Sequence, residues 1–374
     1  MKSSIKKIDK PLFISMIILS ILGLVMVFSS SSISAMLQYG VSSSYFFKKQ
    51  LIVMITGYLV GLFIILRIPI KNYNKWKSML MICLVGALIG LLFYSKVTNG
   101  AQSWYRLGFF SLQPSEFAKA IVIVYIASFF DRHLTSNTRF FFLRPIIACA
   151  VVAILIFLQP DLGTAAILGL LVFIMFMVIP FSKSDKDIKI FKLAGIIALS
   201  AVALVMVFGG ELLNSEQASR LTYKRPCTRY SLKTGYQVCN GMIAINNGGL
   251  FGVGLGNSTQ KYLYLPEGHT DFIFPIIVEE LGSLVGAGVL LLYLFIVFRL
   301  IVIARRSNSL AGSLISFGTA VLLILHLIIN IGGLLALIPL TGVPLPLLSY
   351  GGSSTLTIIG LLFMSLRVSM ENQK

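Results

Sequence analysis

Long apolar blocks recur from one end of the chain to the other and are separated by short polar stretches. A membrane-spanning helix needs about 20 mostly apolar residues. Ten blocks approach that length: Pro11–Ser29, Gln50–Leu66, Ser78–Tyr94, Glu116–Phe130, Leu143–Leu158, Leu162–Phe181, Leu193–Gly209, Phe274–Phe298, Leu310–Ile329 and Ser354–Leu366. The pattern predicts an all-α integral membrane protein, a polytopic bundle of about ten transmembrane helices forming one domain over residues 1–374.

The positions of the basic residues predict the orientation. With the N-terminus inside, the cytoplasmic segments hold 20 of the 31 Lys and Arg residues, the outer loops hold 10, and Lys119 lies within the fourth helix. Six of the outer ten fall in the loop of residues 210–273, whose length weakens the positive-inside rule. Both termini are therefore predicted to be cytoplasmic. The net charge of +18 reflects topology, and no nucleic-acid partner is expected.

Composition excludes several classes of function. Charged residues make up 12% of the chain, whereas soluble domains contain about 25%, so a soluble enzyme is excluded. None of the short cytoplasmic loops carries a P-loop or another nucleotide-binding pattern. We therefore expect no nucleotide cofactor.

Acidic residues at the membrane all fall on the predicted outer side. They are Glu116, Asp161, Glu211, Glu216, Glu267, Asp271, Glu279 and Glu280. Acids inside a membrane are costly and usually functional. Their shared depth predicts a polar site that faces the outside.

Two of these acids stand at predicted helix starts. Proline followed by an acid in the first turn is an ordinary start signal, so Asp161 is either a helix cap or a site residue. Glu116 has Lys119 three residues later, which is ion-pair spacing on a helix. A buried Glu116–Lys119 pair can shape a cavity without touching the substrate.

The segment Tyr264–Phe274 carries the densest set of polar groups. Glu267, His269 and Asp271 share one face of an extended chain, and Glu267 and Asp271 share one face of a helix. The alternative is that Thr270 and Asp271 only start the following helix. Four zinc ligands are not evident, so we expect Mg²⁺ or Mn²⁺, held by Asp271 and substrate phosphates, if a metal is used.

The long outer loop, residues 210–273, adds a basic surface. Its cations are Arg220, Lys224, Arg225, Arg229, Lys233 and Lys261, which suit a phosphate-bearing substrate or merely solvate the loop. Helical spacing after Thr234, ended by Gly248-Gly249, predicts an amphipathic surface helix that carries Gln237. Cys227 and Cys239 can form a disulfide if the loop is extracytoplasmic, and the sequence leaves this open.

The last outer loop cannot be a regular helix, because Pro339, Pro344 and Pro346 precede Gly351-Gly352. Broken apolar backbone at membrane depth is tolerated where it is buried or lines a cavity. The candidate substrate-binding residues are thus Glu267, His269, Arg220, Lys261, Gln237, Ser349 and Ser353.

Four stretches resemble the SEDS (shape, elongation, division and sporulation) family: Gly249–Gly256, Pro266–Phe274, Glu279–Gly282 and Pro344–Ser354. Gly23–Ser30 and Gly256–Lys261 are more similar to its FtsW and SpoVE branches than to RodA. The resemblance implies a peptidoglycan glycosyltransferase that polymerises lipid II, releasing undecaprenyl pyrophosphate, beside a class b penicillin-binding transpeptidase in a division or elongation complex. It implies Asp271 as the catalytic aspartate, and Glu116, Lys119 and Asp161 match a Glu/Lys pair and an acid of the family. We expect these three residues, together with Glu279 and Glu280, in structural or cavity-lining positions.

The chain departs from the family pattern at four positions, Pro275, Val278, His326 and Ala336. Proline at 275 removes the N–H that would bond to the carbonyl of Asp271, so the helix there is expected to start later or to kink. The other three leave the geometry of the neighbouring helices open.

Two alternative functions remain, a lipid II flippase and a non-catalytic division scaffold. A transporter places its polar groups near the bilayer midplane, whereas these groups crowd the outer third of the predicted bundle. A scaffold does not require clustered carboxylates.

Overall fold

The computed structural model describes residues 8–94, 103–106, 111–133, 141–159, 161–181, 189, 192–193, 195–196, 226–229, 233–262, 264–266 and 268–372. Within them lie the α-helices α2 (Lys10–Leu37), α3 (Tyr45–Phe63), α4 (Ile70–Tyr94), α5 (Pro114–His133), α6 (Leu143–Phe157), α7 (Leu162–Val178), α10 (Lys233–Gly248), α11 (Ile273–Arg305), α12 (Leu310–Leu334) and α13 (Gly352–Asn372). Short 3₁₀ turns η1 (Ile65–Arg67) and η3 (Pro226–Arg229) and a two-stranded hairpin, β1 (Tyr105–Arg106) with β2 (Ser111–Leu112), complete the described elements.

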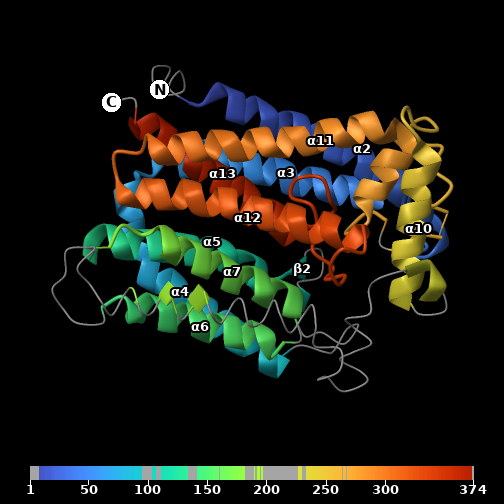
Figure 1. Cartoon of the computed structure of the whole chain (residues 1–374). Helices are drawn as coiled ribbons and strands as arrows, with labels where there is room; N and C mark the ends of the chain where they lie inside the picture. Colours follow the sequence, from blue (N-terminus) through green and yellow to red (C-terminus); the bar gives the residue numbers. More distant parts are fainter. Residues whose placement is uncertain are drawn as a thin grey trace.

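The long helices run alongside one another in a bundle, and α10 lies across one end of it (Figure 1). The start of α2 and the end of α13 meet at the opposite end, where the Asp9 N–H donates to Ser369 Oγ at 3.2 Å. Arg299, near the end of α11, pairs there with Asp9 at 2.5 Å. The two ends of the chain therefore lie on one side of the bundle, and α10 lies on the other.

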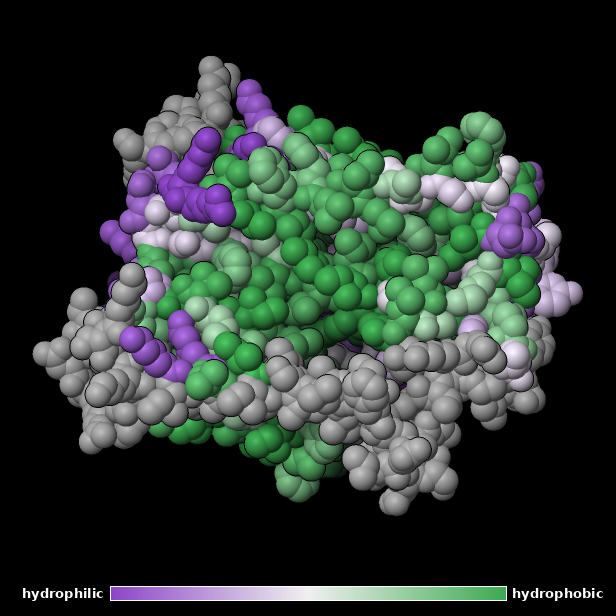
Figure 2. Space-filling model, in the orientation of Figure 1, coloured by the Kyte–Doolittle hydropathy of each residue, from purple (hydrophilic) through white to green (hydrophobic). Residues whose placement is uncertain are grey.

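The apolar sides of the bundle confirm a multi-pass membrane protein. Figure 2 shows hydrophobic side chains covering the middle of the visible face, with hydrophilic residues at its two ends. Among the described residues, six helical stretches are long and apolar enough to cross a membrane: α2, α3 with η1, most of α4, α11, α12 and α13. Nine of the ten predicted spans coincide with described helices, and nearly all of the remaining one, Leu193–Gly209, lies outside the described residues.

Helix α2 extends eight residues beyond its predicted end, through a run of serines. Hydroxyls within this run bond back to the helix: Ser30 Oγ donates to Met26 O at 2.7 Å, and Ser34 Oγ donates to Ser31 O at 3.1 Å. A hydroxyl satisfied in this way can continue an apolar helix at low cost. The predicted end at Ser29 is therefore too early, because the prediction treated the polar serines as the end of the helix.

Helix α11 is broken at Gly282, whose φ of 87° is closed to most side chains. The carbonyls of Glu279 and Glu280 accept from the N–H groups of Val253 and Gly254 at 2.9 and 3.0 Å. In the other direction, the Ser283 N–H donates to Gly249 O at 2.9 Å. The loop that follows α10 thus replaces the hydrogen bonds that the helix loses at its break.

The segment between α12 and α13 is non-helical, as its prolines predict. Its carbonyls are held by side chains from the surrounding helices: Asn330 donates to Val343 O, Tyr293 donates to Pro346 O, and Gln50 donates to Ser349 O. We call residues 335–351 the broken loop. Buried polar side chains therefore supply hydrogen-bond donors to these three carbonyls.

Proline at 275 neither delays nor kinks α11, contrary to the expectation from the sequence. The helix starts at Ile273, so Pro275 lies in the first turn, where a missing N–H is tolerated. The one described non-helical residue inside α11 is Gly282. Val278 is buried, and its methyl group lies beside Gly286.

Ala336 adopts a φ of 53°, in the left-handed region that favours glycine. This residue stands where the family resemblance leads us to expect glycine. A side chain in that conformation costs about 1–2 kcal/mol.

Ala336→Gly should therefore raise the stability of the protein by up to about 1 kcal/mol, because glycine removes the Cβ clash at positive φ. Thermal unfolding in detergent measures the change. The matched control is Ala287→Gly in the interior of α11, which should lower stability by about 1 kcal/mol. Equal losses in both variants would contradict the strain at residue 336.

Candidate active site

A cavity of about 900 Å³ opens among the ends of several helices. Its wall includes Asp271 and Thr270 before α11, Glu116 and Lys119 of α5, Asp161 and Thr164 at α7, and Ser353 of α13. The broken loop contributes Thr341 to Pro344, and the β1–β2 hairpin contributes Arg106 and Ser111. The cavity therefore collects polar groups from elements far apart in the sequence.

Four helices, α5, α7, α11 and α13, direct their N-terminal ends to this cavity, since residues in or just before their first turns line it. A helix N-terminus carries partial positive charge and unpaired N–H groups, so it favours a bound anion. Lys49, Arg106 and Lys119 add three positive side chains to the same wall. The cavity can hold a strongly anionic group while keeping a carboxylate beside it.

Asp271 lies half-buried on the cavity wall, against the broken loop. A Cβ placed on Gly342 would lie only 3.3 Å from Asp271 Oδ2, and Gly342 has a φ of 69°. Glycine at 342 therefore lets the loop backbone pass close to the carboxylate. The backbone carbonyl of Asp271 accepts from Asn330 Nδ2 at 2.8 Å.

Glu116 and Lys119 form the buried ion pair that their spacing predicts, with Nζ 2.7 Å from Oε1. His326 Nε2 lies 3.2 Å from Lys119 Nζ, and His326 Nδ1 lies 3.2 Å from Pro344 O. A neutral imidazole with its proton on Nδ1 satisfies both neighbours, which are a donor and an acceptor. The other oxygen of Glu116, Oε2, is buried and has no hydrogen-bond partner among the described residues.

Asp161 serves in both roles that the sequence left open. Its Oδ1 caps α7 by accepting from the Thr164 N–H at 3.1 Å. Its Oδ2 accepts from Gln113 Nε2 at 3.1 Å and from Ser115 Oγ at 3.2 Å, which ties the starts of α5 and α7 together. The same residue lines the cavity.

The two serine candidates of the broken loop and α13 are placed differently. Ser353 lines the cavity, and its Oγ accepts from the Gln113 N–H at 3.0 Å. Ser349 is buried and is not among the lining residues. Its Oγ accepts from the Leu345 N–H at 2.9 Å inside the broken loop. Ser349 therefore shapes the loop from behind.

Lys261 does not line the cavity. It is buried, and its Nζ lies 2.9 Å from Glu280 Oε1, 2.5 Å from Gly256 O and 3.3 Å from Ser29 Oγ. Glu279 binds the same loop by accepting from Thr259 Oγ1 at 2.9 Å and from Ser258 Oγ. The structure thus places Lys261, Glu279 and Glu280 in one buried network that holds the loop after α10.

The remaining candidates are also away from the cavity wall or outside the described residues. His269 is buried beside the rings of Phe46 and Tyr350, at centroid distances of 4.6 and 5.7 Å. Gln237 is buried on α10 and is not among the lining residues. Arg220 and Glu267 lie outside the described residues.

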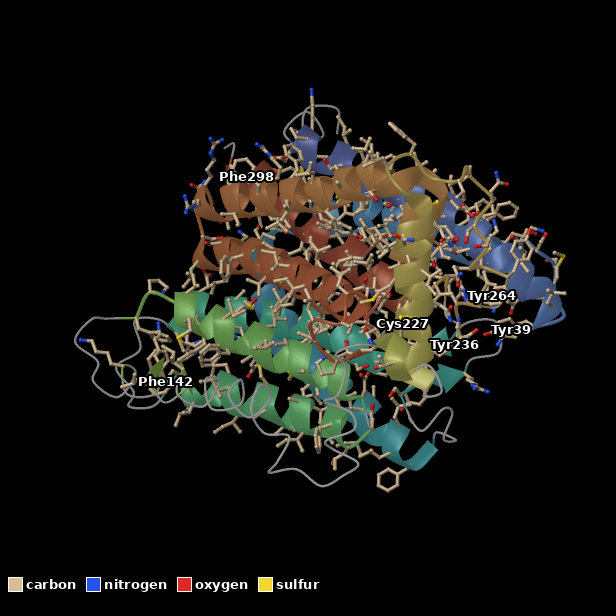
Figure 3. All side chains as sticks on the ribbon, turned by 45° about the vertical axis from the view of Figure 1, so that its right-hand side comes forward. Tyr39, Phe142, Cys227, Tyr236, Tyr264 and Phe298 are labelled. Atoms are coloured by element: carbon tan, nitrogen blue, oxygen red, sulfur yellow. A yellow bond between two sulfur atoms is a disulfide. The ribbon has the colours of Figure 1, made fainter. Side chains whose placement is uncertain are left out.

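A disulfide joins Cys227 of η3 to Cys239 of α10. Figure 3 places Cys227 beside α10, with Tyr39, Tyr236 and Tyr264 toward that end of the molecule and Phe142 and Phe298 toward the other end. Tyr39 and Tyr264 are both exposed, as expected of tyrosines in an interfacial aromatic belt.

Sequence reasoning missed Lys49 and Arg106 as cavity residues, although a signal was present. Outside the long loop, four cations stand on the predicted outer side, Lys48, Lys49, Lys96 and Arg106. Such positions oppose the positive-inside rule and therefore call for a local reason. Two of the four line the cavity, which supplies that reason.

The described residues fit a divalent ion only if a ligand brings most of the oxygens. No group of three or more His, Cys, Asp and Glu side chains among them is arranged to hold an ion. Asp271 and Asp161 each bring a carboxylate to the cavity wall, and both oxygens of Asp161 accept hydrogen bonds. Mg²⁺ is commonly held in this way, by one carboxylate together with substrate phosphates and water.

Together the bundle and the cavity define a polytopic membrane protein with a charged cavity near one end of the bundle. The model of the FtsW/RodA/SpoVE family of cell cycle proteins matches residues 10–374, and the chain belongs to this family. A probable peptidoglycan glycosyltransferase FtsW from Bacillus subtilis (strain 168) is 37% identical over 100% of this chain and 94% of its own length. Stage V sporulation protein E from the same organism is 35% identical over 96% of each chain.

Solved structures share the fold. A chain from a study of a peptidoglycan synthase complex that coordinates polymerization and crosslinking has a TM-score of 0.77 at 24% identity, covering 98% of this chain and 99% of that one. The rod shape determining protein RodA from Thermus thermophilus has a TM-score of 0.68 at 23% identity, covering 98% of each chain.

Lys261→Met should destabilise the protein by about 3–5 kcal/mol, because it leaves the buried Glu280 carboxylate without its cation. The double variant Lys261→Met/Glu280→Gln should be markedly more stable than Lys261→Met, since it removes both charges together. Thermal unfolding of the purified proteins measures the coupling. Purely additive losses would contradict a structural pair.

Proposed function

We propose that this protein is a peptidoglycan glycosyltransferase that polymerises lipid II into glycan strands on the outer face of the bacterial cytoplasmic membrane. One observation carries the proposal: Asp271 lies on the wall of a cavity that is also lined by four helix N-termini and by Lys49 and Arg106. That arrangement pairs a general base with a site for a pyrophosphate leaving group. A relative named a probable peptidoglycan glycosyltransferase, 37% identical over the full chain, supports the same activity.

In this mechanism, Asp271 accepts the proton from the 4-hydroxyl of the acceptor lipid II. The oxygen then forms a bond to the anomeric carbon of the donor chain, whose bond to undecaprenyl pyrophosphate breaks with inversion. The pyrophosphate leaves with the electron pair. The energy is already in the substrate, so no nucleotide is needed.

Positive groups around the cavity stabilise the charge that develops on the leaving group. The helix N-termini are preorganised for this, and Arg106 and Lys49 supply full charges. These residues take the role that the sequence suggested for Lys261, whose ammonium is paired with Glu280. Mg²⁺ or Mn²⁺ held by Asp271 would supply further neutralisation of the phosphates.

Orientation and partner follow from the same proposal. From the distribution of basic residues we infer that both termini are cytoplasmic, which would make the cavity, near the other end of the bundle, face outward. A class b penicillin-binding transpeptidase is the proposed partner, supported by the fold shared with a chain from a complex that polymerises and crosslinks. We assign the chain to cell division because an FtsW protein is its relative at 37% identity.

Polymerisation is preferred to transport of lipid II because the carboxylates and cations gather near one end of the bundle. A transporter would bind its substrate near the midplane. Purified protein with its partner and lipid II should yield glycan strands. No strands with transbilayer movement in vesicles would indicate a flippase, and neither activity would indicate a scaffold.

Asp271→Asn should lower polymerisation by about 10²–10⁴-fold, because the amide cannot accept the proton. Gel separation of glycan strands measures the activity, and size-exclusion chromatography checks folding. Asp131→Asn is the matched control, since this residue lies in the last turns of α5 and its Oδ1 accepts from the Ala311 N–H, which an amide oxygen can also do. Substantial polymerisation by folded Asp271→Asn protein would contradict the role of Asp271.

Removing divalent ions should lower polymerisation, and adding Mg²⁺ or Mn²⁺ should restore it, because the leaving pyrophosphate needs neutralisation. A chelator titration followed by add-back, with the metal content measured directly, provides the test. Full activity in metal-free protein would show that Lys49, Arg106 and the helix ends suffice.

A further inference from the structure

Asn330 of α12 joins the two backbone segments that form the cavity wall around Asp271. Its Nδ2 donates to Asp271 O at 2.8 Å and to Val343 O at 2.7 Å. Asn330 is buried, with 4% of its surface exposed. One side-chain amide therefore holds the segment that carries the carboxylate and the broken loop that packs against it.

The orientation of this amide follows from its neighbours. Both are carbonyl oxygens, so only the NH₂ end can face them, because an amide oxygen would be repelled by each. The Asn330 Oδ1 is buried without a partner among the described residues. The contribution of this side chain therefore comes through its two N–H donors.

Pro275 explains why the Asp271 carbonyl depends on Asn330. In an α-helix the N–H of residue 275 would donate to the carbonyl of residue 271. Proline has no N–H, so residue 275 cannot donate to that carbonyl. The Asp271 carbonyl is partly buried and is followed by the buried residues Phe272 and Ile273. A buried acceptor without a hydrogen bond is costly.

The second bond of Asn330 matters for the same carboxylate. Val343 follows Gly342, the residue whose missing side chain allows the loop to approach Asp271 Oδ2. One turn earlier in α12, His326 holds the next carbonyl, Pro344 O, at 3.2 Å. The polar face of α12 thus sets the position of the loop relative to the carboxylate.

We propose that Asn330 is a positioning residue for Asp271, which supplies the hydrogen bond that Pro275 cannot and fixes the carboxylate segment against the broken loop. The inference rests on the proposed function, because it assigns Asn330 a part in catalysis by Asp271. A displacement of about 1 Å at a general base can cost 10²-fold in rate.

The test is a double-mutant cycle between Asn330→Leu and Pro275→Ala in the full-length protein with its transpeptidase partner. Asn330→Leu should lower kcat for lipid II polymerisation by about tenfold or more with KM within about twofold, since positioning of the base acts on the transition state. Pro275→Ala alone should change kcat by less than about threefold. In the double variant, the backbone N–H that alanine restores at position 275 bonds to Asp271 O, so most of the lost kcat should return.

The control is Thr319→Val, which removes a buried hydroxyl from α12 that donates only to Ile315 O in its own helix. It should leave kcat unchanged, and Pro275→Ala should not alter its effect. Wild-type kcat in Asn330→Leu, or an equal loss in both backgrounds, would overturn the inference. If Asn330→Leu fails to fold in both backgrounds, Asn330 is a packing residue and the inference is likewise overturned.

The outcomes for Asn330 and for the proposed function are distinguishable. Absence of glycan strands from wild-type protein would reject the glycosyltransferase activity itself. Normal strands from wild type together with normal strands from Asn330→Leu would reject only the positioning role.

Discussion

The structure depends on pairing backbone groups where its helices are interrupted inside an apolar bundle. In lipid or in a buried core, each unpaired N–H or carbonyl costs several kcal/mol. The described part of the chain contains two such interruptions, the break of α11 at Gly282 and the broken loop between α12 and α13. At the first, the loop after α10 supplies backbone partners, and at the second, Asn330, His326, Gln50 and Tyr293 supply side-chain partners.

These interruptions also explain the location of the site. A helix that starts inside a bundle directs the positive end of its dipole there, and α5, α7, α11 and α13 all start around one cavity. That positive potential favours an anionic substrate in the cavity. The same broken backbone that is costly to bury therefore provides the electrostatic environment for pyrophosphate departure.

Buried charges in this protein serve two distinct purposes. Lys261 and Glu280 neutralise each other and hold a loop, with no exposure to the cavity. Glu116 and Lys119 are also paired, but they line the cavity and leave Oε2 of Glu116 without a partner among the described residues. Distance along the sequence from Asp271 did not predict which of these lysines lines the cavity. Lys261 is nearer to Asp271 in sequence than Lys119 is, yet Lys119 lines the cavity and Lys261 does not.

The sequence by itself determined the membrane class, the ten described α-helices including α10, the non-helical loop before α13 and the gathering of acids on one side. Apolar length, helical spacing, proline and scarce charge act locally, so the sequence alone reveals them. It also indicated Asp271, Glu116, Lys119 and Asp161 as cavity residues. Only the tertiary structure decided that Lys261 faces Glu280, that Lys49 and Arg106 face the cavity, and that Asn330 replaces the donor missing at Pro275. Lys261 and Glu280 are 19 positions apart, and Asn330 and Asp271 are 59 positions apart. Helix packing rather than local pattern sets which side chains meet over such separations.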